Sequence, residues 1–343
     1  GERPSIIYVL ADDLGYGDLG CYGQKMIQTP NLDRLAADRL RFTQHYAGSP
    51  VCAPSRCTLM TGKHTGHATR RSNRPYVPIG ENDVTVAEIL KPAGYQTAVV
   101  GKWGLADTTA DFEPGTAGKP NQRGFDYWFG FLNQKHAWNY YPDFVWENEE
   151  QYVLNGAKYV HDLFTEKSLT FIRRHHKTPF CIFVEYTTPH VNNAFGHTDD
   201  NLPVPSLEPY HDKDWPLIEK KYAAMVTRLD RDVGRIVNLL DELGTAENTI
   251  VMFSSDNGAQ SYKPHSRDFF QSTAGLRGYK GRLYEGGIRT PFVVRWPKVV
   301  KPGTVSDHIS AFWDLVPTIA ELVGSQPPIN TDGISFLPTL KGE

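Results

Sequence analysis

The sequence contains no run of about 18 apolar residues, the length that a membrane-spanning helix needs, so we expect no membrane span. Its 343 residues include only four cysteines, at positions 21, 52, 57 and 181, and no Cys-x-x-Cys pair. This excludes a zinc ribbon, a thioredoxin motif and a disulfide framework. Neither sign of charge prevails, because 36 lysines and arginines face 39 aspartates and glutamates. We therefore expect no nucleic-acid partner, and an anionic substrate has to be held by a local basic patch.

A signal peptide and an Asn-x-Ser/Thr sequon are also missing. Gly1-Glu2-Arg3-Pro4 leads directly into an apolar run, so the chain is either cytosolic or mature after export. We expect an exported bacterial protein, periplasmic or extracellular, with its signal peptide removed. Nothing in the sequence predicts the oligomeric state.

Apolar runs alternate with amphipathic segments, which predicts an α/β fold with a large, mainly parallel or mixed sheet and helices on both faces. The length fits one large domain or two smaller ones. The stretch 105–150 is rich in Gly, Pro, Asn and aromatic residues and is interpreted as a long loop insertion. Strands are predicted at Ser5–Leu10, Gln96–Val100, Phe180–Tyr186, Thr249–Ser254 and Pro291–Trp296, and helices at Asn31–Arg39, Val84–Leu90, Asp162–His175, Leu217–Leu243 and Phe312–Leu322.

Charged and polar residues follow the apolar strands directly. The set comprises Asp12, Asp13, Lys102, His190, Asp256 and Asn257. Because the carboxyl ends of parallel strands line one crevice, these side chains are expected to meet. Three carboxylates raise one another's pKa unless a cation lies between them, and an all-oxygen set favours Ca²⁺, or Mg²⁺, over zinc. The alternative is structural, with Asp12 capping a loop and Asp256-Asn257-Gly258 forming a turn.

Cys52 precedes a predicted short helix. Pro54 suits the first turn of that helix and Gly62 suits its end. Cys52 then lies at the helix N-terminus, where unpaired N–H groups favour an anion, and Arg56 on the first turn can point back toward it. A buried cysteine before a helix is the ordinary alternative.

With these residues the chain resembles the formylglycine-dependent type I sulfatases of the alkaline-phosphatase-like superfamily. Cys52-Ala-Pro-Ser-Arg56, followed by Leu59-Met-Thr-Gly62, matches the family's C-x-P-S-R core and its trailing L-x-T-G. The resemblance runs from Ile6 to about Leu340 and includes further motifs in the family's order: Asp12-Asp13, Gly101-Lys102-Trp103, Thr188-Pro189-His190, Ser255–Gly258, Leu276–Gly281 and Glu285–Arg289. It implies that residues 1–343 form the N-terminal catalytic domain of a sulfatase, with the usual small C-terminal subdomain absent or cut off.

The resemblance also implies the roles of these residues. A maturation enzyme oxidises Cys52 to formylglycine, whose hydrate is the nucleophile. Position 52 and four strand-end residues hold Ca²⁺: Asp12, Asp13, Asp256 and Asn257. Arg56 and Lys102 steady the diol, Lys102, Lys280 and His190 bind sulfate, and His190 donates the proton to the leaving alcohol. One diol oxygen attacks sulfur while the metal and the cations spread the charge, and the second hydroxyl expels sulfate.

One position departs from the family pattern. Gly101-Lys-Trp-Gly104 stands where the family has Gly-Lys-Trp-His, as in a bacterial branch that also carries a stretch like Asn133–Pro142. We hypothesise that His136 fills the place of the missing histidine. An ordinary loop histidine is the alternative.

A basic segment, residues 63–74, follows the Cys52 helix. It carries Lys63, His64, His67, Arg70, Arg71 and Arg74. A solvated face is the common explanation for such a run. With a sulfated polymer as substrate, His67, Arg70 and Arg71 are predicted to hold neighbouring sulfates. Trp138, with Tyr140, Tyr141 and Trp146, is a candidate for stacking on sugar rings, or else part of a local core.

The function indicated is hydrolysis of sulfate esters on carbohydrate, with polysaccharide fragments favoured. Galactose or N-acetylgalactosamine sulfates are the specific expectation. The enzymatic alternative is a phosphate or phosphonate monoester hydrolase of the same superfamily. The non-enzymatic alternative is an unmatured protein that binds sulfated glycans with Cys52 still a thiol.

Overall fold

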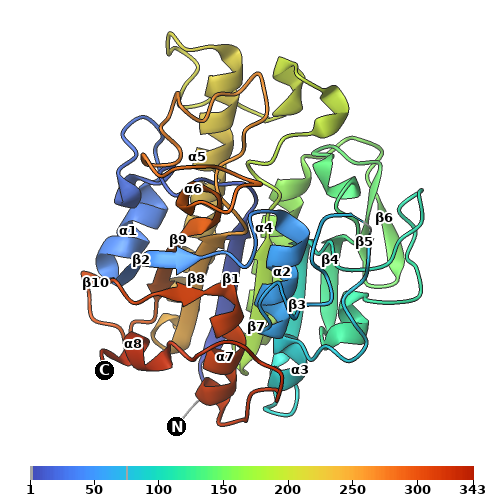
Figure 1. Ribbon diagram of the computed structural model, residues 1–343, viewed down its shortest axis with the longest axis vertical. Helices are drawn as coiled ribbons and strands as arrows, with labels where there is room; N and C mark the ends of the chain where they lie inside the picture. Colours follow the sequence, from blue (N-terminus) through green and yellow to red (C-terminus); the bar gives the residue numbers. More distant parts are fainter. Residues whose placement is uncertain (1–2, 75) are drawn as a thin grey trace.

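The computed structural model describes residues 3–74 and 76–343, which form a mixed sheet between two layers of helices (Figure 1). Five neighbouring strands at its centre run parallel, in the order β8-β1-β7-β3-β4, and β9 and β5 continue the sheet antiparallel on either side. The strands are β1 (Ser5–Ala11), β2 (Leu40–Tyr46), β3 (Gln96–Lys102), β4 (Tyr127–Phe131), β5 (Phe144–Glu147), β6 (Glu150–Val153), β7 (Phe180–Glu185), β8 (Thr249–Ser255), β9 (Arg289–Arg295), β10 (Thr304–Ser306) and β11 (Ser310–Ala311).

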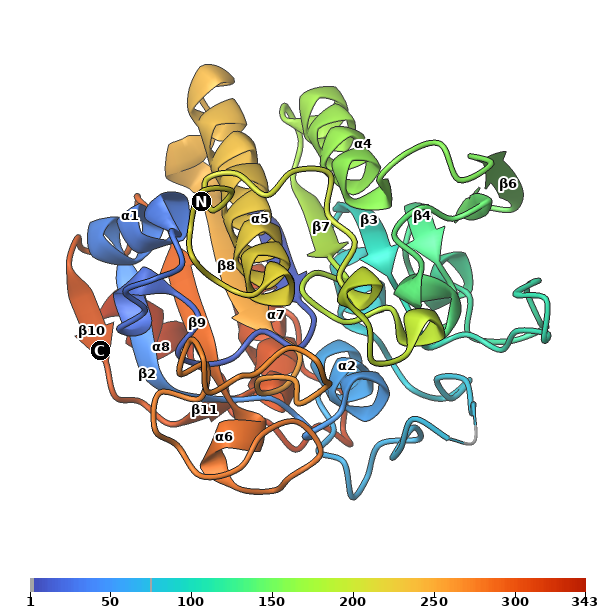
Figure 2. The same ribbon diagram turned by 90° about the horizontal axis from the view of Figure 1, so that it is seen from above.

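Helices cover both faces of the sheet, because side chains alternate along each buried strand. In β1, Ile7 and Val9 face a core with α1, α4 and α5, whereas Ile6 and Tyr8 face a core with α2, α3 and α7. Figure 2 shows α1, α4 and α5 on one face of the sheet and α2 and α7 on the other. The helices are α1 (Pro30–Asp38), α2 (Cys52–Thr61), α3 (Val86–Leu90), α4 (Val160–His175), α5 (Leu217–Glu242), α6 (Glu285–Ile288), α7 (Leu315–Val323) and α8 (Leu337–Lys341). No helix of the described residues is long and apolar enough to cross a membrane.

The predicted α/β class, with its mixed sheet, is confirmed, and each of the five predicted strands is present. The predicted helices are present too, with shifted ends. The helix expected from Val84 begins at Val86, because Thr85 caps it and Glu88 completes the capping box. The helix expected from Phe312 begins as a 3-10 turn, Phe312–Asp314, before α7.

The interpretation of 105–150 as a loop insertion is wrong in part. This stretch contains β4 and β5, and β4 pairs in parallel with β3 and extends the sheet. Trp128, Phe129 and Phe131 are buried, so the aromatic residues of this stretch belong largely to the core. Gly130 interrupts the aromatic run, so the composition of this stretch is typical of a loop. The φ of 143° at Gly130 brings its backbone close to the backbone of Gly101.

Candidate active site

The carboxyl ends of β1 and β8 bring three acidic side chains and one amide together. The two strands pair in parallel with Ala11 opposite Ser255, so Asp12 and Asp13 follow one strand where Asp256 and Asn257 follow the other. Asp13 adopts a left-handed backbone (φ 66°), and its N–H donates to Asp256 Oδ1 at 3.1 Å. Asn257 Nδ2 donates to Asp13 Oδ1 at 2.8 Å. All four side chains are fully buried, as the strand-end pattern predicts.

Two cations from other elements neutralise part of this charge. Lys102, the last residue of β3, pairs with Asp12. Arg56 on α2 donates from Nε to Asp256 Oδ2 at 3.0 Å. We call Asp12, Asp13, Arg56, Lys102, Asp256 and Asn257 the strand-end cluster.

The two aspartates that share Arg56 respond differently to their surroundings. Burial opposes the ionisation of Asp12, but Lys102 and the neighbouring cations outweigh it and lower the pKa of Asp12 below its ordinary value. Burial, together with the negative charge of Asp12, raises the pKa of Asp256 to about 7. A cation between these carboxylates would offset the repulsion from Asp12 that contributes to the raised pKa of Asp256.

The strand-end cluster fits a divalent metal ion. Among the described residues, buried Asp12 Oδ1 and Asn257 Oδ1 have no hydrogen-bond partner. Ligand atoms of Asp12, Cys52 and Asp256 all lie within 4.8 Å of one another. Orphaned buried oxygens beside acidic groups are ligands that Ca²⁺ or Mg²⁺ accepts.

Cys52 lies at the first position of α2 and is 3% exposed. Pro54 lies within the first turn and Gly62 ends the helix in the left-handed conformation (φ 69°), as predicted. The Cys52 Sγ atom lies 3.6 Å from Asn73 Nδ2, and Asn73 Oδ1 accepts from the Ala53 N–H at 3.0 Å. Asn73 thus satisfies one free N–H of the helix beside Cys52. Asn73 could not be predicted from the sequence, since an asparagine in a polar loop carries no signal of its own.

Arg56 is fully buried and donates hydrogen bonds to three groups. Besides Asp256, its Nη1 donates to the Lys102 carbonyl oxygen at 2.8 Å and to Glu185 Oε2 at 2.9 Å. Burial raises the pKa of Glu185 to about 7, and Arg56 opposes the shift. Glu185 ends β7, so a carboxylate at the end of an apolar strand was the signal that would have found it. It orients Arg56 rather than facing Cys52.

Lys280 and His190 reach the cluster from two loops. Lys280 Nζ donates to Asp13 Oδ2 at 2.7 Å, and His190 Nε2 lies 3.6 Å from the same oxygen. Burial, with a smaller effect of Lys280, lowers the pKa of His190 to about 4. The His190 Nδ1 atom bonds the Val191 carbonyl oxygen at 2.6 Å, which fixes the ring and turns Nε2 toward Asp13. The structure brings every predicted metal ligand together with Lys102, Lys280 and His190, the three residues expected to bind the reacting sulfate.

Gln134, and not His136, occupies the space beside Gly104. Gly104 is left-handed (φ +68°), and a Cβ there would lie 2.0 Å from Gln134 Nε2. The His136 ring instead stacks on Phe112, with centroids 4.5 Å apart, and meets Phe131 at 4.8 Å. Burial lowers the pKa of His136 to about 4. A catalytic role of His136 stays a prediction, and the place we assigned to it is taken by an amide.

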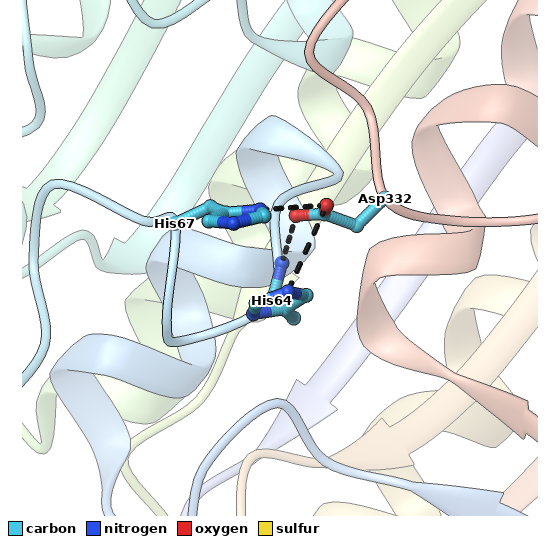
Figure 3. A group of neighbouring side chains, drawn as sticks. All are labelled: His64, His67 and Asp332. Atoms are coloured by element: carbon cyan, nitrogen blue, oxygen red, sulfur yellow. Dashed lines mark hydrogen bonds and ion pairs between the residues drawn. The ribbon is translucent and has the colours of Figure 1, made fainter.

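Most side chains of the basic segment have partners of their own. His67 Nδ1 lies 2.8 Å from Asp332 Oδ1, and the rings of His64 and His67 stack at 4.2 Å (Figure 3). Lys63 pairs with Asp83 at 2.6 Å. These three side chains, with Asp332, hold the loop after α2 in place, and the ligand atoms of His64, His67 and Asp332 lie within 4.8 Å of one another.

The expected sulfate ligands of this segment differ in exposure. Arg70 is 1% exposed and donates to the Val77 and Asn73 carbonyl oxygens, so it supports the loop that carries Asn73. Arg71 is exposed, and its Nε donates to the Ala68 carbonyl oxygen at 3.0 Å. Arg70 is thus buried beneath the loop, with Nη1 and Nη2 bonded to backbone carbonyl oxygens, and its role in binding sulfate stays a prediction.

Trp138 is the more accessible tryptophan of the aromatic stretch, half-buried in a 3-10 turn, His136–Trp138. Trp146 and Tyr140 are buried, and the Tyr140 hydroxyl donates to the His190 carbonyl oxygen. These two side chains therefore belong to the core and cannot stack on a sugar. The role proposed for Trp138 stays a prediction.

Such a fold, with charged side chains gathered at the strand ends, defines an alkaline-phosphatase-like hydrolase. The solved structure of Ps i-CgsB in complex with k-i-k-neocarrahexaose superposes with a TM-score of 0.83 at 30% identity, covering 100% of this chain and 77% of that chain. The family model described as Sulfatase matches residues 4–325. The chain therefore belongs to the sulfatase family, a class of sulfuric ester hydrolases.

Curated relatives come from the same family. Human steryl-sulfatase is 30% identical over 428 residues, which cover 100% of this chain and 70% of the relative. Human N-acetylgalactosamine-6-sulfatase is 33% identical over 372 residues, covering 99% of this chain and 66% of the relative. The chain thus spans about two thirds of the length of these two proteins.

Proposed function

We propose that the strand-end cluster hydrolyses sulfate esters of carbohydrates, using a formylglycine made from Cys52 and a bound Ca²⁺, with Mg²⁺ as the other candidate ion. One observation carries the proposal. The unpartnered oxygens of Asp12 and Asn257 lie in the cluster that surrounds Cys52, and Lys280 and His190 approach the same cluster. This arrangement combines a metal site, a nucleophile position and anion-binding cations in one buried volume.

Each group of the chain has a physical task in this scheme. Asp12, Asp13, Asp256 and Asn257 would hold the metal, which when bound draws charge from the sulfate oxygens. As a hydrated aldehyde, position 52 supplies one hydroxyl to attack sulfur and a second to expel sulfate. Arg56 and Lys102 are already oriented by carboxylates, so they stabilise developing charge without reorganising.

Lys280 and His190 would bind the substrate and donate a proton to it. Lys280 is 9% exposed and stays charged because, although burial opposes it, Asp13 raises its pKa. It can bind a sulfate oxygen. The negative charge of a bound sulfate ester favours the protonated ring of His190, whose Nε2 then gives its proton to the leaving alcohol.

The names of similar proteins support a sugar substrate. They include N-acetylgalactosamine-6-sulfatase and a protein solved with k-i-k-neocarrahexaose. We propose sulfated polysaccharide fragments as the substrate class, a maturation enzyme as the partner that oxidises Cys52, and export to the bacterial periplasm or the exterior. Residues 1–343 would form the catalytic domain.

The test compares leaving groups on one sugar. Sulfate and phosphate esters of the same N-acetylgalactosamine hydroxyl are incubated with protein co-produced with a maturation enzyme, and free sulfate and phosphate are measured by ion chromatography. We expect sulfate release, lost in Cys52→Ala. Faster phosphate release would favour the phosphate or phosphonate hydrolase. Binding of sulfated glycan without release of either ion would favour the glycan-binding protein.

A further inference from the structure

A loop rich in arginine and tyrosine, residues 262–284, surrounds Lys280. The Lys280 N–H donates to the Ala259 carbonyl oxygen, and the Gly281 N–H donates to the Pro50 carbonyl oxygen at 2.8 Å. The first bond fastens the loop to the segment after β8 and the second to the segment just before Cys52. Arg277 and Arg282, three and two positions from Lys280, are exposed, whereas Lys280 itself is buried. The loop therefore presents two guanidinium groups outside the buried lysine.

Aromatic rings hold these guanidinium groups. The Arg277 Cζ atom lies 3.8 Å from the centroid of the Tyr284 ring, and its Nη2 donates to the Tyr284 hydroxyl at 2.8 Å. The Cζ atoms of Arg267 and Arg282 lie 4.0 and 5.7 Å from the centroid of the Tyr279 ring. Cation–π contacts orient a guanidinium but leave its N–H donors free for an anion.

Positive charge prevails in this loop, although Arg267 pairs with Asp268 and Lys280 with Asp13. Residues 262–284 contain five lysines and arginines and one aspartate, in a chain whose net charge is −3. No ion pair among the described residues includes Arg277 or Arg282. Among the described residues of the basic segment, by contrast, Lys63 and His67 pair with aspartates. Unpaired, pre-oriented arginines next to a buried anion-binding lysine indicate a second place for an anion.

We propose that Arg277 and Arg282 form a second sulfate subsite, which binds a sulfate group on the sugar next to the one that is desulfated. Tyr284, 48% exposed, and Leu283, 80% exposed, offer apolar surface to the sugar ring between the two sulfates. The α-carbons of Arg282 and Arg277 lie within about 7 and 11 Å of that of Lys280 by chain length alone, so both arginines are close to the lysine that would bind the reacting sulfate. The substrate class is then a multiply sulfated oligosaccharide. This inference rests on the proposed function.

The test is a ratio of two rates. kcat/KM is measured for a disulfated oligosaccharide and for its monosulfated form, and the ratio is compared between wild type and variants. Arg277→Gln and Arg282→Gln are each expected to lower the ratio about tenfold, the scale of one charge-assisted hydrogen bond. Arg173→Gln, an exposed arginine on α4, is the control and should leave the ratio unchanged. An unchanged ratio in both loop variants would overturn the subsite.

A binding measurement separates this inference from the proposed function. Cys52→Ala protein is titrated calorimetrically with the same two oligosaccharides, with and without the arginine variants. If the disulfated form binds about tenfold more tightly and the double variant loses this preference, the subsite stands even when no sulfate is released. If the two forms bind equally tightly, the subsite is wrong, whatever the enzyme hydrolyses. Melting temperatures of all variants confirm that they fold.

Discussion

The strand-end cluster and the basic segment both gather charge close to Cys52, but they use it differently. In the cluster, cations and carboxylates converge from three strands and one helix, and two buried oxygens have no hydrogen-bond partner in the part of the chain that the structure describes. In the basic segment, Lys63 and His67 each have a carboxylate and Arg70 has backbone carbonyls. The cluster therefore has buried oxygens available to a cation, whereas most charged side chains of the basic segment already have partners. Unmet hydrogen-bonding capacity, rather than density of charge, marks the functional region.

Replacing Arg56 should give the largest loss of stability. Arg56→Met leaves Asp256 and Glu185 buried without their cation, which costs about 3–5 kcal/mol. Arg71→Met in the basic segment should change the free energy of unfolding by less than about 0.5 kcal/mol. Urea unfolding measures both. Equal losses in the two variants would show that the two regions do not differ.

Lys280 of the proposed active site and Lys63 of the basic segment should differ in their effect on catalysis. Lys280→Ala should lower kcat/KM by roughly 10²–10³, the scale for losing one charge-stabilising donor. Lys63→Ala, which breaks only the pair with Asp83, should lower it less than about threefold. The assay is sulfate release under identical conditions. A loss below threefold for Lys280→Ala would contradict its assignment.

Metal removal tests which region binds the ion. A chelator should abolish activity and lower the melting temperature, since an ion present at 100 times its dissociation constant stabilises the fold by about 2.7 kcal/mol. Asp256→Asn should remove the response of the melting temperature to chelator. Asp332→Asn, which disrupts the other group of possible ligands, should keep it. The opposite pattern would move the metal to His64, His67 and Asp332.

The smallest effect is expected for His67. It is 65% exposed, so its pair with Asp332 contributes at most about 1 kcal/mol. Although burial opposes it, His67 lowers the pKa of Asp332, so the pair stabilises the fold above the ordinary aspartate pKa of about 3.9 and loses that effect as the pH falls below it. Thermal unfolding of His67→Ala between pH 3 and 7 checks this. A difference from wild type that grows toward pH 3 would contradict it.

The site residues that could be predicted from the sequence are those that lie at the carboxyl ends of strands. Asp12, Lys102 and Asp256 each come directly after an apolar run, and parallel pairing alone brings such residues to one edge. The parts that could not be predicted depend on contacts between distant segments. Asp332 contacts His67 from 265 positions away, and the amide of Gln134 fills the space at Gly104 from the turn after β4. Neither contact leaves a pattern in the local sequence.

β2 and β4 could not be predicted from the sequence, because contacts with distant segments decide their structure. β2 mixes polar and apolar residues, and its neighbours β9 and β10 decide that it becomes a strand. β4 lies in a segment whose glycine and aromatic residues are typical of a loop. Its burial against β3 and α4 decided its structure.

A mass spectrum of the tryptic peptide Phe42–Arg56 tests the central claim most directly. The protein is co-produced with a maturation enzyme and assayed for sulfate release in the same preparation. We predict an aldehyde, or its hydrate, at position 52 in place of the thiol, in proportion to activity. An unmodified thiol at Cys52 in protein that releases sulfate at full rate would contradict the account.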